Sequence, residues 1–144
     1  MRKSIQLIAA ATSVASLGLI TMPAAHADNA IISIKKKGEL SSSNKIAWVK
    51  AKVTCSEDTT SGELQATLTQ VTRGGTQTST GYIYAYSAFE CTGDEEKVYI
   101  PVRRPTGGFK WVKGQARVTN VTFTSYDPSG SFTDTAKGRT VTLR

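Results

Sequence analysis

Residues 46–55, Ile-Ala-Trp-Val-Lys-Ala-Lys-Val-Thr-Cys, form the stretch that decides the fold. Apolar and polar side chains alternate along it, which predicts a β-strand with one buried face. In this phase Val49, Val53 and Cys55 point inward. An inward cysteine at the end of a strand is well placed for a disulfide between two sheets.

The N-terminus has the features of a targeting segment. Arg2 and Lys3 precede a weakly apolar run from Leu7 to Ile20, and Ala25-His26-Ala27 provides a small-x-small cleavage pattern. The run is shorter than the roughly 20 residues that cross a membrane. The sequence therefore predicts a cleaved signal peptide at residues 1–27 and a single secreted, extracellular domain at residues 28–144, with no membrane anchor in the mature chain.

The expected mature chain lacks several catalytic groups. Cleavage would remove His26, the only histidine, and leave Cys55 and Cys91 as the only cysteines. If these two pair, Ser-His-Asp catalysis, Cys-His catalysis and histidine or thiolate metal sites are all excluded. Without Arg2 and Lys3, 16 of the 18 basic residues remain against 11 acidic ones, a modest excess that suits a soluble surface. No nucleic-acid partner is expected.

The two cysteines are expected to form one disulfide. Exported small domains meet an oxidising environment, in which two cysteines usually pair. Cys55 and Cys91 are 36 positions apart. Closing a loop of that length stabilises a fold by about 4 kcal/mol in the chain-entropy model.

The remaining sequence favours strands and predicts no helix after residue 28. Turn-forming clusters recur at intervals typical of a β-sandwich or barrel, for example at Leu40–Asn44 and Tyr126–Gly130. Pro101 at an outward position indicates an edge strand, and a change of phase indicates a bulge near Asn120. The expected strands are Ile31–Lys36, Ile46–Cys55, Glu63–Val71, Thr80–Ser87, Lys97–Arg103, Phe109–Val118, Ser131–Ala136 and Arg139–Leu143.

Several short segments resemble small secreted domains of unknown function found in actinobacteria. The matching segments are Val53-Thr54-Cys55-Ser56, Phe89-Glu90-Cys91-Thr92-Gly93, Lys97–Val102, and Phe109 with Gly114-Gln115-Ala116-Arg117-Val118. The resemblance implies an all-β, immunoglobulin-like antiparallel β-sandwich of about seven or eight strands, and it implies no activity. The architecture is also similar to that of neocarzinostatin-type chromophore carriers, which usually have two disulfides where this chain can form one.

Two strands combine a tryptophan with outward cations at period two. The first is Trp48, Lys50 and Lys52, and the second is Trp111, Lys113 and Arg117. If both strands lie in one sheet, these residues would form a basic, aromatic stripe for an anionic polymer. The structural alternative is that each tryptophan covers an end of the sandwich and the cations keep a face soluble.

A tyrosine ladder is the other candidate ligand surface. Tyr82, Tyr84 and Tyr86 are expected on one face, about 7 Å apart along the strand. If exposed, they would form a platform for sugar rings or a protein partner. If buried, they would be cross-strand packing with hydroxyls at the rim.

No catalytic, metal or cofactor site is predicted. Asp127 and Asp134 flank a turn, with nothing to set the distance that carboxylate catalysis needs. Asp94-Glu95-Glu96 lacks the alternating spacing of a calcium loop. Gly74-Gly75 and Gly107-Gly108 are interpreted as turn glycines and not as phosphate cradles.

The residues thus favour a non-enzymatic extracellular binding protein of unknown specific function. Its first candidate ligand is a carbohydrate or cell-envelope polymer, such as an extracellular polysaccharide. The alternative is a carrier of a small aromatic molecule in a cleft of the sandwich, and a carboxylate hydrolase is a third class. The sequence itself does not name a ligand.

Overall fold

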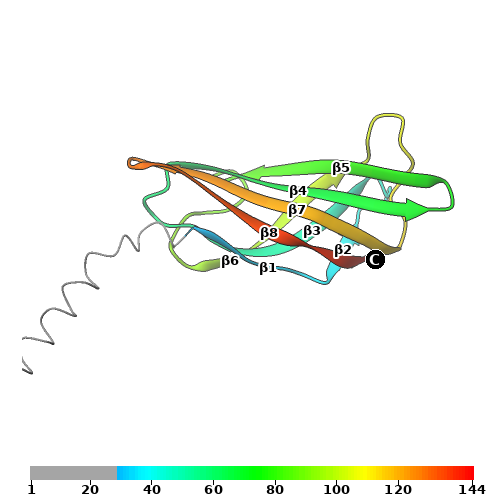
Figure 1. Cartoon of the computed structure of the whole chain (residues 1–144), viewed down its shortest axis with the longest axis horizontal. Coiled ribbons are helices and arrows are strands. Elements are labelled where there is room, and N and C mark those ends of the chain that lie inside the picture. Colours follow the sequence, from blue (N-terminus) through cyan, green and yellow to red (C-terminus); the bar gives the residue numbers. More distant parts are fainter. Residues whose placement is uncertain (1–28) are drawn as a thin grey trace, which may run out of the picture.

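A computed structural model describes residues 29–144 (Figure 1). These residues contain no helix, and the expectation of an all-β domain with seven or eight strands is confirmed. The predicted signal peptide and its cleavage point lie outside the described residues. The eight strands are β1 (Ala30–Ile34), β2 (Lys37–Leu40), β3 (Ile46–Thr54), β4 (Ser61–Thr72), β5 (Gly75–Tyr84), β6 (Glu95–Arg103), β7 (Gly114–Asp127) and β8 (Gly130–Leu143).

The strands form one open sheet in the order β1-β3-β2-β8-β7-β4-β5, with β6 paired to β3. We refer to β1, β3 and β6 as the β3 group, and to β8, β7, β4 and β5 as the β7 group. Figure 1 shows the long strands of the β7 group lying side by side. Because β6 pairs only with β3 among the described strands, it is an edge, as Pro101 predicts.

The short strand β2 joins the two groups. It pairs antiparallel with β3 and parallel with β8, so the expectation of a purely antiparallel sheet is wrong at this point. The predicted first strand, Ile31–Lys36, is also wrong at its end. The chain leaves β1 at Ile34 and restarts at Lys37, and Leu40 belongs to a strand instead of a turn. Only glycine fits at Gly38, where a Cβ would lie 2.8 Å from the Leu143 side chain and 2.9 Å from the Trp48 carbonyl.

Both groups contribute alternate side chains to one hydrophobic core. Along β3 the buried and half-buried positions alternate over the whole strand, with Val49 and Val53 inside, as predicted. β4 and β7 do the same with Leu68 and Phe123. Burying one large apolar side chain stabilises a fold by about 1.5–3 kcal/mol, so this alternation is the main determinant of which face of each strand is covered.

The pairing of β7 with its neighbours β4 and β8 explains two irregularities in the predicted strands. In the β4–β7 ladder Thr67 faces Asn120 and Leu68 faces Val118, which confirms the bulge expected near Asn120. The two C-terminal strands predicted at Ser131–Ala136 and Arg139–Leu143 are one continuous strand, β8. Pairing with β7 spans the interruption that the local sequence pattern suggested.

The disulfide between Cys55 and Cys91 is present, as predicted. Both cysteines are buried, but they do not connect the two groups. Cys55 follows β3 and Cys91 precedes β6, which are neighbouring strands paired up to Thr54 and Glu95. The Gly93 amide also donates to the Cys55 carbonyl, at 2.8 Å. The disulfide therefore closes one end of the β3–β6 ladder.

Candidate functional site

Trp111 is a core residue and not part of an outward stripe. Its side chain is fully buried, and its indole N–H donates to the Val102 carbonyl at 3.0 Å. The strand predicted from Phe109 begins only at Gly114, where φ is +126°, so the period-two phase does not extend back to Trp111. The side chain of the next residue, Val112, is exposed.

The second half of the predicted stripe is therefore dispersed. Lys113 precedes β7, and Arg117 lies exposed on β7, opposite Thr69 of β4. Both lie apart from the cations of β3, because β2 and β8 separate β3 from β7 in the order of strands. The structure does not bring the two tryptophan segments together into one surface.

The first half of the stripe does lie on one outward face, that of β3. Trp48, Lys50 and Lys52 are all half-buried there, as the alternation predicts. Lys50 forms an ion pair with Glu39 and lies 5.5 Å from the centre of the Tyr99 ring. Lys52 is 3.5 Å from Glu95. Two of the predicted cations therefore already have acidic neighbours.

The tyrosine ladder has two members instead of three. Tyr82 and Tyr84 are 46% and 52% exposed on the outward face of β5, which favours the exposed interpretation over cross-strand packing. The expectation that Tyr86 continues this face is wrong, because β5 ends at Tyr84 and Tyr86 has φ +64°. The Tyr86 hydroxyl donates to the Thr59 carbonyl and anchors a neighbouring loop.

A third tyrosine joins this face from a different strand. Tyr126, part of the turn that the sequence predicts, is instead the last outward side chain of β7 and is 49% exposed. It pairs with Ser61 of β4, two positions before Glu63, which pairs with Tyr84. The parity of Tyr126 with Thr122 and Thr124 was the signal in the sequence, since every second residue shares a face.

Threonines fill most of the remaining outward positions of the β7 group. We call this surface the threonine face. Two cross-strand pairs join β4 and β5, and two join β7 and β8. The pairs are Thr67–Thr80 and Thr69–Thr78, with hydroxyl oxygens 2.8 Å apart, and Thr122–Thr135 and Thr124–Thr133, at 3.4 Å. Sequence reasoning missed these pairs because they depend on the register between distant strands.

The threonine face offers many hydroxyls and few charged groups, one of which is the Glu63 carboxylate between Tyr84 and Thr124 in the register. A hydroxyl has one donor and two acceptor positions, so a paired threonine keeps part of its capacity for a ligand. Gln65 lies between Tyr82 and Thr122 in the register and adds an amide. Stiff β-branched side chains limit the rotamer entropy lost on binding. The surface is suited to ligands that combine hydroxyls with apolar ring faces.

The two carboxylates considered for catalysis, those of Asp127 and Asp134, accept hydrogen bonds from backbone amides. One Asp127 oxygen accepts hydrogen bonds from the Ser129 and Gly130 amides, at 2.7 and 3.1 Å. Asp134 accepts from the Ile31 amide at 2.8 Å and so ties β8 to β1. Both carboxylates have clear structural roles. Within residues 29–144, no group of three or more His, Cys, Asp or Glu residues is arranged to hold a metal ion.

No protein-family model, no curated protein and no solved structure matches this chain. Across the described part of the chain, no helix has the length and apolar character needed to cross a membrane.

Proposed function

We propose that this protein is a secreted, non-enzymatic binding protein that holds a neutral polysaccharide on its threonine face. The observation that carries the proposal is the exposure of Tyr82, Tyr84 and Tyr126 on the same face as four pairs of threonine hydroxyls. Tyrosine combines an apolar ring with a polar tip, which matches the mixed surface of a sugar. Threonine hydroxyls and the Gln65 amide would hydrogen-bond the sugar hydroxyls.

We also propose that the domain is an immunoglobulin-like sandwich and that it is extracellular. A β3 group and a β7 group that share one core are what an immunoglobulin-like sandwich would present, with β2 passing from one sheet to the other. The buried Cys55–Cys91 disulfide supports an oxidising, extracellular location after removal of residues 1–27. The resemblance to small secreted actinobacterial domains agrees with both points.

We expect Tyr82→Ala/Tyr84→Ala to weaken polysaccharide binding strongly. Each tyrosine at the centre of an interface contributes about 1–2 kcal/mol, so the Kd for a bound polysaccharide should rise about 30-fold or more. The measurement is affinity electrophoresis in gels that contain hydroxyethyl cellulose, glycol chitin or soluble starch. The gel that retards the native protein most is then used for the variants.

The matched control is Tyr99→Ala. Tyr99 is 49% exposed, as exposed as the two test residues, but lies on β6 in the β3 group. We expect this variant to bind like the native protein. Equal loss in Tyr99→Ala and in the double variant would show that the threonine face is not the binding surface.

A further inference from the structure

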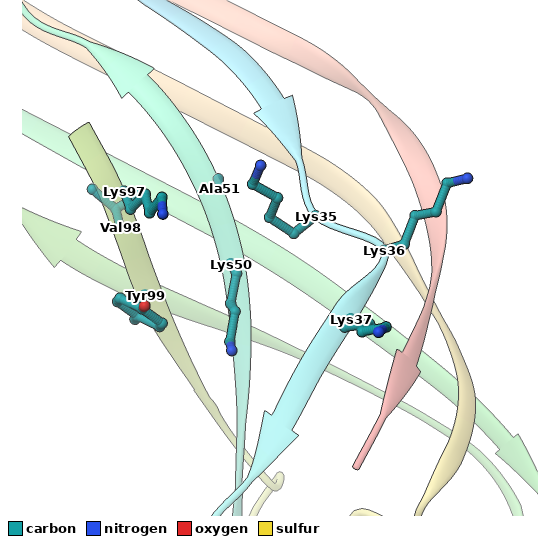
Figure 2. A pocket seen from close by; sticks show the side chains of 8 residues that line it. All are labelled: Lys35, Lys36, Lys37, Lys50, Ala51, Lys97, Val98 and Tyr99. Atoms are coloured by element: carbon teal, nitrogen blue, oxygen red, sulfur yellow. The ribbon is translucent and has the colours of Figure 1, made fainter. Parts of the chain in front are cut away.

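The break between β1 and β2 creates a second surface, which we call the lysine groove. It is a groove of about 380 Å³ lined by Lys35, Lys36, Lys37, Lys50, Ala51, Lys97, Val98 and Tyr99 (Figure 2). Figure 2 shows Lys35 and Lys97 on either side of β3, with Lys50 lying along that strand. The groove belongs to the β3 group and its junction with β2, away from the threonine face.

The backbone holds the lysine run firmly in place. The Lys35 amide donates to the Lys50 carbonyl of β3, and the Lys36 carbonyl accepts from Thr142 of β8, both at 2.8 Å. Lys37 then pairs with Thr142 in the β2–β8 ladder. The backbone of the three successive lysines is thus hydrogen-bonded or paired to β3 on one side and to β8 on the other. The backbone positions from which these side chains extend are therefore fixed.

Most of the positive charge in the groove is uncompensated. Lys50 has its ion pair with Glu39. Among residues 29–144, no acidic side chain lies within ion-pair distance of Lys35, Lys36, Lys37 or Lys97. Cations that are clustered around a concave surface repel one another and raise the local concentration of anions. An anionic ligand would relieve this repulsion.

The composition of the groove indicates the kind of anion. Arginine recognises carboxylates and phosphates through a planar, bidentate fork, whereas lysine is a compact point charge that binds phosphate without demanding one geometry, which suits several phosphates spread along a flexible ligand. The groove contains only lysines, and its lining also includes the apolar side chains of Ala51 and Val98 and the exposed ring of Tyr99. A ligand with repeated phosphates could contact several lysines at once while an uncharged part packs on Tyr99.

We propose that the lysine groove binds the phosphate groups of a phosphate-rich polymer. The site is independent of the threonine face and uses different residues. The protein would therefore contact a neutral polysaccharide with one surface and an anionic polymer with another. Of the β3 cations predicted from the sequence, only Lys50 lines the groove, while Lys52 lies outside it beside Glu95.

Calorimetric titration of the protein with inorganic polyphosphate tests this site. At about 0.05 M salt, where charge interactions are weakly screened, we expect binding that weakens steeply as salt is added. Lys35→Gln/Lys97→Gln should raise the Kd at least about tenfold, which corresponds to about 1.4 kcal/mol, because two charged contacts to phosphate are lost. The control is Lys110→Gln/Lys113→Gln, which removes the same charge from the segment before β7.

The outcomes separate the site from general charge attraction. The site requires a large loss in the first variant and a small one in the control, with amide NMR shifts at Lys50, Lys97 and Tyr99. Equal losses in both variants, or no binding of polyphosphate, would overturn the proposal. Inorganic monophosphate is the second ligand. If it binds as tightly as polyphosphate, the groove is a site for a single free phosphate and not for a polymer.

Discussion

We expect Trp111→Ala to lower the free energy of unfolding by about 4 kcal/mol, among the largest effects of any single substitution in this chain. The side chain is completely buried and is the largest in the core. Truncation would leave a cavity and would also deprive the Val102 carbonyl of its indole donor, which is 3.0 Å away. The segment before β7 would lose its anchor in the core. The hydrogen bond from the Trp111 amide to the Asn44 carbonyl, 2.9 Å long, should therefore weaken as well.

Urea unfolding of matched variants measures this effect. Trp111→Phe keeps most of the apolar volume and removes the indole donor, so its loss should be clearly smaller. Trp48→Ala removes the same kind of side chain from a half-buried, outward position on β3 and should also cost much less. Equal losses in the free energy of unfolding for Trp111→Ala and Trp48→Ala would contradict the assignment of Trp111 to the core. They would instead support the outward position of Trp111 in the basic, aromatic stripe.

The second large effect is expected from removing the disulfide. In Cys55→Ala/Cys91→Ala the closed loop of 36 residues is opened, which costs about 4 kcal/mol in the chain-entropy model. In a domain of this size about 4 °C of Tm corresponds to 1 kcal/mol, so Tm should fall by roughly 15 °C. The measurement is thermal unfolding followed by circular dichroism under oxidising conditions.

Reduction supplies the control for this variant. A reductant should lower the Tm of the native protein toward that of Cys55→Ala/Cys91→Ala and leave the Tm of the variant unchanged. Because the disulfide closes the end of the β3–β6 ladder, amide exchange should increase first near Thr54 and Glu95. A Tm of the variant equal to that of the native protein would show that the disulfide does not stabilise the fold.

The local pattern of the sequence was sufficient for the strands whose alternation is regular. In β3 every second residue is buried, so period two alone predicts Val49, Val53 and the outward Lys50. The turn before Gly130, the edge position of Pro101 and the bulge near Asn120 also follow from local rules. Each of these features depends on a few neighbouring residues.

Features that depend on distant strands were missed. The burial of Trp111 requires a segment outside any strand to fold against Val102, which no periodicity encodes. The parallel pairing of β2 with β8 joins Lys37 and Thr142, which are 105 positions apart in the sequence. Tyr86 has the spacing of a strand residue but a left-handed backbone, because the chain turns there toward the buried Phe89.

In the candidate binding surfaces, too, features within one strand were predictable, and features that depend on the pairing of distant strands were not. Tyr82 and Tyr84 were predictable, since they belong to one strand. The threonine face was not, because Thr67 meets Thr80, and Thr122 meets Thr135, only in the final register. In the lysine groove the run of lysines is visible in the sequence, but its proximity to Lys97 and Tyr99 depends on the pairing of β1 and β6 with β3.

The most direct test of the threonine face is sedimentation of the purified domain, residues 28–144, with insoluble cellulose or chitin, both uncharged polysaccharides, at low and high salt. At about 1 M salt the Debye length is ~3 Å, so charge-driven binding is largely screened. We expect one of these polymers to retain the domain at both salt concentrations, because tyrosine stacking and threonine hydroxyls carry the binding. Failure of both polymers to retain it, or retention that disappears at high salt, would contradict the account.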